Sequence, residues 1–133
     1  MHRFRYAAFA ATLLVGTVGA MGVRADANDY TFQLVTQTIA RSDVVTIDVR
    51  LVNRTTGESV TGAIVFATRL DMQPDGMETM TAPLEAVSAA EAGHYTFNAR
   101  LAMAGQWRLS LAAKIQGEEG TVQSRLVFQA VDQ

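Results

Sequence analysis

The amino-acid sequence predicts an all-β protein, a single antiparallel β-sandwich of about seven strands preceded by an N-terminal signal helix. Apolar and polar residues alternate with a period of two through much of the chain, which is typical of strands that are buried on one face. Short clusters of turn residues separate these segments. No segment carries a sustained apolar stripe at helical spacing, so a parallel sheet with crossover helices is not expected.

Residues 1–25 have the three parts of a secretory signal peptide. Arg3 and Arg5 form a basic start, Tyr6–Val23 is uncharged and rich in small and apolar residues, and Val23 and Ala25 fit a cleavage site after Ala25. Tyr6–Val23 is also about long enough to span a membrane, so an uncleaved anchor is the alternative. Both interpretations place residues 26–133 outside the cytoplasm. We expect these residues to form one domain in the periplasm.

The expected strands follow one another along residues 26–133. Alternation is strict in three segments, which are Val44–Val52, His94–Leu101 and Gln106–Ile115. It is looser in Tyr30–Gln37 and Thr121–Val131. Ser59–Leu70 is more evenly apolar, which is typical of a central strand, and a seventh strand is possible in Ala82–Ala89. Turns are expected between them, at Asn53–Gly57, Glu91–Gly93, Ala104–Gly105 and Gly117–Gly120.

One stretch, Asp71–Pro83, does not have the pattern of a strand. Pro74 cannot donate a ladder hydrogen bond, and Pro74-Asp75-Gly76 is a turn sequence. We therefore expect a long loop here, and long ordered loops often carry function.

Composition excludes several classes of function. Residues 26–133 hold eight basic and thirteen acidic residues, a net charge of −5 without a basic cluster, so nucleic acid is not an expected partner. The chain has no cysteine, which rules out thiolate metal sites and cysteine nucleophiles. His94 is the single histidine after residue 25, and no nucleophile motif accompanies it. We expect neither an enzyme nor a small-molecule substrate.

The candidate metal ligands are four methionines and one histidine: Met72, Met77, Met80, Met103 and His94. Three of the methionines fall within nine residues of the expected loop, and thioether sulfur is a soft ligand that suits Cu(I). Two other interpretations stay open, because methionine also fills irregular gaps in a core and adapts to partner surfaces. Met103 shares the inward parity of Leu101, so the pattern alone makes it a core residue. His94 is expected on an outward face, and Trp107 in the core.

Several motifs resemble the YtkA-like and FixH-like family of exported domains. These motifs are Gly62-Ala63-Ile64-Val65, Asp71-Met72-x-Pro74-x-Gly76-Met77-x-x-Met80, Gly93-x-Tyr95-x-Phe97 and Leu101-x-Met103-Ala104-Gly105-x-Trp107-x-Leu109. The resemblance implies an immunoglobulin-like sandwich and a role in copper handling. It also implies a partner such as a membrane-bound metal transporter, an efflux adaptor or an oxidase subunit. By this resemblance, the methionine positions of the family correspond to Met72, Met77, Met80 and Met103.

Two hypotheses about function follow from the sequence. The first is a periplasmic Cu(I) carrier or buffer that binds the metal through its methionine-rich segment, in copper resistance, efflux or oxidase assembly. The second is a metal-free interaction module whose methionines contact a membrane partner. Replacing the methionines by leucine distinguishes the two, because leucine keeps the apolar surface and removes the sulfur.

Overall fold

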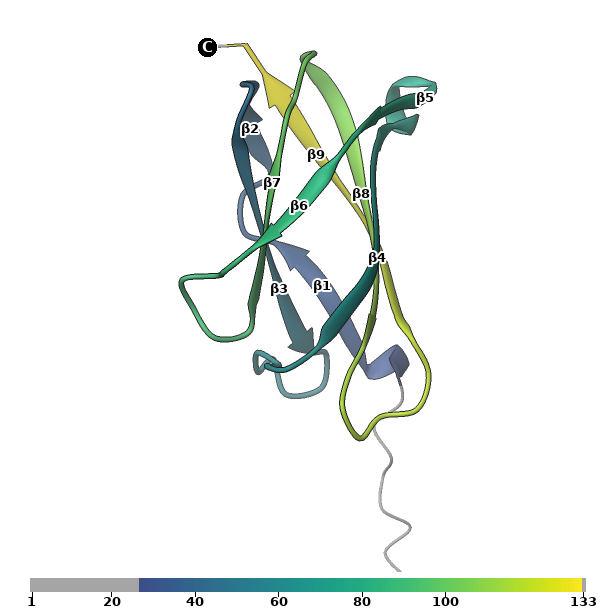
Figure 1. Cartoon of the computed structure of the whole chain (residues 1–133). Helices are drawn as coiled ribbons and strands as arrows, with labels where there is room; N and C mark the ends of the chain where they lie inside the picture. The colour runs from purple at the N-terminus through teal and green to yellow at the C-terminus, as the bar shows by residue number, and fades with distance from the viewer. Residues whose placement is uncertain (1–26, 133) are drawn as a thin grey trace, which may run out of the picture.

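The computed structural model describes residues 27–132, so the expected signal peptide, residues 1–25, lies outside the described part of the chain. The described residues form nine strands and two short 3₁₀ turns (Figure 1). The strands are β1 (Tyr30–Leu34), β2 (Thr38–Ala40), β3 (Val45–Asn53), β4 (Ile64–Met72), β5 (Met77–Ala82), β6 (Leu84–Val87), β7 (His94–Ala99), β8 (Gly105–Lys114) and β9 (Val122–Val131). The 3₁₀ turns are η1 (Ala27–Asp29) and η2 (Gln73–Asp75). The expected all-β sandwich is confirmed.

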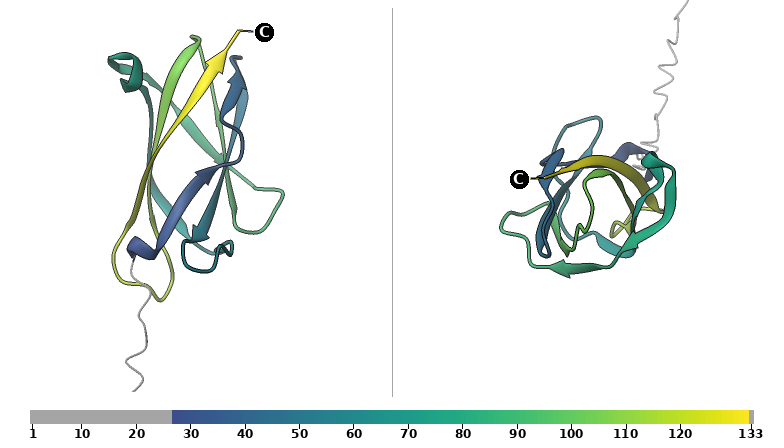
Figure 2. Two further views of the ribbon diagram at one scale, coloured as in Figure 1. Left: turned by 180° about the vertical axis from the view of Figure 1, so that it is seen from behind. Right: turned by 90° about the horizontal axis from the view of Figure 1, so that it is seen from above.

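The strands form two facing sheets, ordered β1-β3-β7-β6 and β2-β9-β8-β4-β5. All pairs are antiparallel except the short parallel pair of β2 with β9. At each side of the sandwich, one stretch of chain passes from the edge of one sheet to the edge of the other: β1 continues into β2, and β5 into β6. The view from above in Figure 2 shows the two layers closing around the core between them.

The core is built by the alternation that the sequence shows. In β3 the buried side chains include Val45, Ile47, Val49 and Leu51, and in β8 they are Trp107, Leu109, Leu111 and Ala113. Complete burial of a large apolar side chain contributes about 1.5–3 kcal/mol, which allows a domain of this size to fold without disulfides. The expectation that Trp107 lies in the core is confirmed.

The expected long loop at Asp71–Pro83 is wrong, because most of this stretch forms a β-hairpin. Pro74 lies in η2, and Gly76 adopts a left-handed conformation with φ of 75°, donating its N–H to the carbonyl of Gln73 over 2.8 Å. This tight turn brings Met77 opposite Met72 and lets β5 pair with the end of β4. The turn predicted at Pro74-Asp75-Gly76 is therefore confirmed, and the residues that follow it form the strand β5 instead of a loop.

The expected central strand at Ser59–Leu70 is also wrong in its extent and in its surroundings. The strand begins at Ile64, and β5 pairs only with its last three residues, Leu70–Met72. Ile64 and Phe66 are consequently 60% and 56% exposed. A register shift between Val65 and Ala67 forms a bulge at Phe66.

Two further expectations on the strands need correction. The strand expected at Tyr30–Gln37 ends at Leu34, and Thr38–Ala40 forms a separate short strand, β2, which the sequence does not predict. Met103 is 37% exposed and is not a core residue. The chain leaves β7 at Ala99, so the inward parity of Leu101 does not extend through the following turn to Met103.

Candidate functional site

The candidate site is built on the β4–β5 hairpin and the start of β8, at the end of the sandwich that is uppermost in Figure 1. The turn of the hairpin packs against β8 through Asp75, whose carboxylate accepts a 2.8 Å hydrogen bond from the N–H of Gln106. A Cβ atom at Gly105 would lie 2.7 Å from the Cε methyl of Met72 and would also collide with the Asp75 carboxylate. Glycine at position 105 is therefore what allows the hairpin to lie so close to β8.

This packing joins the two most distinctive parts of the sequence. The methionine segment supplies η2 and β5, and the segment from Met103 to Trp107 supplies the turn into β8. The indole N–H of Trp107 donates a 3.1 Å hydrogen bond to the carbonyl of Met103, which fixes this turn to the buried ring. The two segments therefore meet where η2 packs against β8, and Met77 and Met103 lie close to this contact along the chain.

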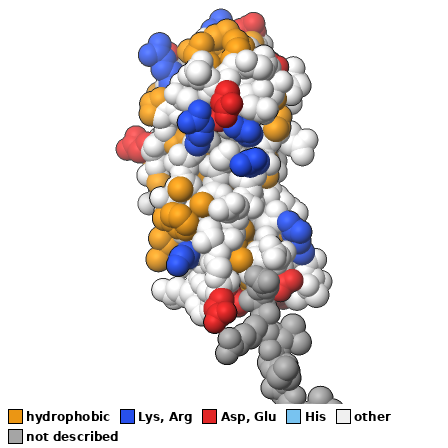
Figure 3. Space-filling model, turned by 90° about the vertical axis from the view of Figure 1, so that its right-hand side faces the viewer, with side chains coloured by type: hydrophobic (Ala, Val, Ile, Leu, Met, Phe, Trp, Pro, Cys, Tyr) orange, Lys and Arg blue, Asp and Glu red, His pale blue; other side chains and the backbone are white. Residues whose placement is uncertain are grey.

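The four methionines differ in their access to solvent. Met72 is 0% exposed, and Met77, its cross-strand neighbour, is half-buried. Met80 on β5 is 38% exposed, close to the value of Met103. The side view in Figure 3 shows hydrophobic side chains gathered at this end of the molecule. Met77, Met80 and Met103 can therefore meet a ligand from solvent, whereas Met72 packs inside the core.

His94 lies apart from the methionines. It begins β7, while Ala99, at the other end of that strand, leads to the turn that holds Met103. A strand rises about 3.3 Å per residue, so five residues separate His94 from Ala99 by roughly 16 Å. Both ring nitrogens of His94 face carboxylates: Nδ1 lies 2.9 Å from Asp48 Oδ2, and Nε2 lies 3.2 Å from Glu91 Oε2. The structure therefore does not bring His94 into the methionine group.

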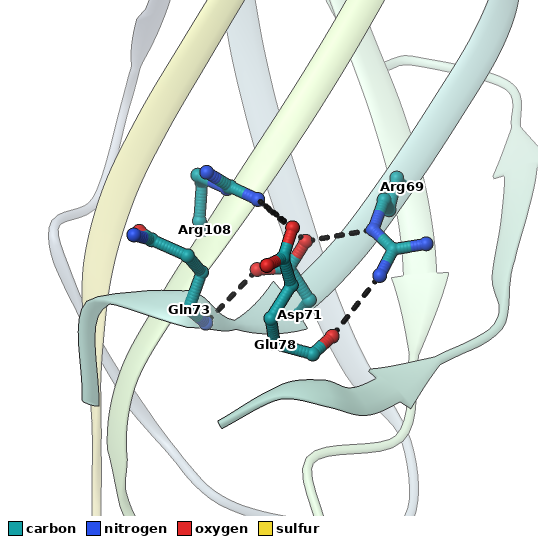
Figure 4. A network of polar contacts seen from close by, with 5 residues as sticks. All are labelled: Arg69, Asp71, Gln73, Glu78 and Arg108. Atoms are coloured by element: carbon teal, nitrogen blue, oxygen red, sulfur yellow. Dashed lines mark hydrogen bonds and ion pairs between the residues drawn. The ribbon is translucent and has the colours of Figure 1, made fainter. Parts of the chain in front are cut away.

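A buried carboxylate, Asp71, supports the hairpin from the outer face of the sheet (Figure 4). Its Oδ2 atom accepts hydrogen bonds from Arg69 Nε at 2.8 Å and from Arg108 Nη2 at 3.1 Å, and its Oδ1 accepts one from the N–H of Gln73 at 2.9 Å. Arg69 also donates to the carbonyl of Glu78 over 3.0 Å, so the network reaches from β4 and β8 to β5. It clamps the methionine hairpin in place.

The electrostatics of Asp71 result from two opposing effects. Burial alone raises the pKa of its carboxyl group, because the charged form loses hydration. The hydrogen bonds from the Gln73 N–H and from the Arg108 and Arg69 guanidinium groups outweigh burial and hold the pKa below the ordinary value of 3.8. Asp71 is therefore a carboxylate at neutral pH. The sequence contains one signal for this network, since Arg69 and Asp71 are two residues apart on a strand and share a face.

Two kinds of feature are absent from the described part of the chain. Among residues 27–132, no three His, Asp or Glu side chains are grouped so that they could hold a metal ion. In the same residues, no helix is long and apolar enough to cross a membrane.

Comparison with known protein families decides the relationship of the chain. Residues 24–112, about two thirds of the sequence, match the model of the YtkA-like family. The chain belongs to the YtkA-like family. The expected resemblance is thereby confirmed for its YtkA-like part, and the hairpin and the turn at Met103 lie within the matched residues of this YtkA-like domain.

Comparison with individual proteins adds little to the family match. No curated protein matches the chain. Among solved structures, the chain is similar to the Lin-41 filamin domain, with 18% identity over 68% of this chain and 87% of that one and a TM-score of 0.42. It is also similar to the ZirS C-terminal domain, with 9% identity over 98% of this chain and 79% of that one and a TM-score of 0.47. Neither similarity bears on function.

Proposed function

We propose that this YtkA-like protein is an exported accessory protein that binds Cu(I) through methionine thioethers and carries or buffers the ion. The partner that receives the ion would be a membrane-bound metal transporter, an efflux adaptor or an oxidase subunit. Family membership supports an exported accessory role. The copper chemistry rests on the donor set, because thioether sulfur binds soft Cu(I) without having to lose a proton.

The observation that carries the proposal is the placement of the solvent-accessible methionines. Met77 and Met80 lie on β5, and Met103 lies in the turn before β8, against which the β4–β5 hairpin packs. We assign these three as ligands. Met72, although a candidate by sequence, is completely buried against Gly105 and supports the hairpin instead. His94 is held between Asp48 and Glu91 and is left out of the set.

Weak, exchangeable ligation suits such a role. Two of the three ligands are exposed by more than a third, so a partner that offers further sulfur ligands can reach the ion. The Asp71 network ties β5 to β4 and β8 through Arg69, which would limit the movement of the strand that carries Met77 and Met80 before metal arrives. The proposal implies binding and transfer, with no catalytic turnover.

A Cu(I) titration of the purified exported protein against a competing chromophoric chelator tests the proposal. Ag(I) serves as a redox-silent check. We expect stoichiometric binding that the Met77→Leu/Met80→Leu variant loses by at least about tenfold in affinity, since leucine offers no donor atom. Met72→Leu is the matched control, with the same substitution at a buried position, and it should bind like the wild type. Wild-type affinity in the double variant would refute the proposed ligands.

The second candidate, a metal-free interaction module, is favoured by one observation. Met80 and Met103 are exposed apolar side chains at one end of the molecule, and flexible methionine surfaces adapt to partners. Under this alternative, the double leucine variant keeps its partner and the protein does not compete with the chelator. The same titration therefore separates the two candidates.

A further inference from the structure

The four methionines of residues 27–132 are the groups of this domain that an oxidant attacks most readily. The chain has no cysteine, so no thiol competes with the thioethers for an oxidant or diverts the product into a disulfide. Trp107, whose indole ring is also open to oxidation, is only 1% exposed. An oxidant that reaches the folded domain from solvent therefore meets thioether sulfur.

Access to solvent sets an order among these methionines. Met80 and Met103 are 38% and 37% exposed, Met77 is half-buried, and Met72 is 0% exposed. A dissolved oxidant reaches a buried sulfur atom only when the structure opens locally. Met80 and Met103 should therefore react first and at similar rates, Met77 more slowly, and Met72 last.

Met72 is protected by the packing of the hairpin against β8. It belongs to the core, and its Cε methyl group lies so close to Gly105 that a Cβ atom added there would approach it to 2.7 Å. An oxidant would reach Met72 only if the hairpin separated from β8, against the hydrogen bond from the N–H of Gln106 to the Asp75 carboxylate. Met72 is thus an internal reference for an intact fold.

Oxidation of the two exposed methionines is compatible with the fold. Methionine sulfoxide is polar, whereas the thioether is apolar. Met80 and Met103 already meet water over more than a third of their surface, so a sulfoxide group at either position stays hydrated. The same group at Met72 would be buried, where a polar atom without a hydrogen-bond partner is costly. The domain therefore tolerates the modification at Met80 and Met103 and opposes it at Met72.

The reaction transfers one oxygen atom to sulfur. With hydrogen peroxide, the O–O bond breaks, an S–O bond forms on the thioether, and the remaining oxygen leaves as water, so that the sulfur is oxidised and the peroxide reduced. A methionine sulfoxide reductase reverses the change, because two thiols become a disulfide and the sulfoxide oxygen leaves as water. The sulfoxide presents a hard oxygen in place of the soft thioether, and hard donors suit Cu(I) poorly.

We propose that Met80 and Met103 are sites of reversible oxidation, and that their conversion to sulfoxides turns off soft-metal binding by this protein. The second part rests on the proposed function, in which both residues are ligands. The exposure that lets a partner reach the bound ion also admits the oxidant to the empty site. Bound metal occupies the sulfur lone pairs and protects them. An exported methionine sulfoxide reductase is the class of enzyme that restores the site.

Treatment of the purified exported protein with hydrogen peroxide, without metal, tests the first part. Peptide mapping by mass spectrometry follows each methionine separately. We expect Met72 to be oxidised at least about tenfold more slowly than Met80 and Met103, because its sulfur is reached only after local opening. The protein oxidised at Met80 and Met103 should keep its melting temperature. Equal rates at Met72 and Met80, or loss of the folded state when Met80 and Met103 react, would overturn the assignment.

Ag(I), which is redox-silent, tests the link to the metal. Ag(I) should slow the oxidation of Met80 and Met103 and leave the rate at Met72 unchanged. The oxidised protein should bind Ag(I) at least about tenfold more weakly than the untreated protein, and methionine sulfoxide reductases for both sulfoxide epimers should restore the affinity. Unchanged affinity after oxidation would overturn the switch alone. Untreated protein that does not bind Ag(I) would overturn the proposed function and the switch together.

Discussion

The two halves of β4 differ sharply, although they belong to one continuous strand. Leu70, Asp71 and Met72 are completely buried or nearly so, whereas the residues from Ile64 to Arg69 are mostly exposed. Both halves pair with β8, the first of them with a bulge at Phe66, so the main difference lies on the other side of the strand. There, β5 covers the end of the strand and leaves its beginning open. Burial along β4 therefore depends on whether β5 pairs with it, more than on the hydrophobicity of the residues of β4.

The largest expected effect is the difference in stability loss between two variants, each of which shortens a side chain in one half of β4. Leu70→Ala should lower the free energy of unfolding by about 3–4 kcal/mol, because it leaves a cavity in the covered half. Phe66→Ala removes a larger side chain from the open half and should cost less than about 1 kcal/mol. Urea unfolding of both variants measures the difference. Equal losses would mean that the open half is covered in solution.

The next effect concerns the carboxylate that holds the covered half. Asp71→Asn should cost about 3 kcal/mol, because two guanidinium groups lose a buried counter-charge. Asp43→Asn is the matched control: Asp43 forms an exposed pair with Arg100 and should cost less than about 0.5 kcal/mol. A small effect at Asp71 would show that pairing of β5 with β4 suffices to hold the hairpin.

The same carboxylate makes the covered half sensitive to acid. The pKa of Asp71 is lower in the folded protein than its ordinary value of 3.8, so the charged form favours folding. Its contribution is fully present above the unfolded pKa and is lost as the pH falls through the folded pKa. The stability gap between wild type and Asp71→Asn should therefore be constant from pH 7 to about pH 5 and should close below pH 4. Unfolding at a series of pH values measures this gap, and a gap that does not change would assign the acid sensitivity to other groups.

A third effect tests the contact between the hairpin and β8. Gly105→Ala should cost about 2 kcal/mol, because its φ is 138° and the added methyl group meets Met72 and Asp75. Gly57→Ala shares a positive φ but has open space around it, and it should cost only about 1 kcal/mol. Thermal unfolding compares the two variants. Similar losses would mean that backbone strain alone explains glycine at position 105.

Sequence reasoning predicted the part of the fold that depends on local pattern. Strict alternation placed β3, β7 and β8 close to their observed bounds, and it placed Trp107 in the core, because period-two burial is a property of a strand by itself. It failed at β5, since Pro74 and Gly76 indicate a turn but do not reveal that the following residues pair back onto β4. Pairing between strands depends on the whole sheet.

The candidate site shows the same limit. The sequence identified the methionines as a group, and in the structure the two segments that carry them meet where η2 packs against β8. The sequence could not show that Met72 is buried and Met80 exposed, because their burial depends on where β5 and Gly105 lie. Met103 was expected in the core because parity was extended beyond the end of β7. The Asp71 network also went unrecognised, since Arg108 reaches it from a different strand.

The smallest expected effect is at Glu78, on the strand that covers β4. The Glu78 carbonyl accepts a hydrogen bond from Arg69, whereas its side chain is 68% exposed and lies 3.7 Å from Arg108. Glu78→Gln removes the charge and keeps the carbonyl, so it should change the free energy of unfolding by less than about 0.5 kcal/mol. Urea unfolding of the variant and of the wild type, each at low and at high salt, measures this change. A loss as large as that of Asp71→Asn would mean that the Glu78 carboxylate holds β5 in place, and that the backbone contacts contribute less than the geometry indicates.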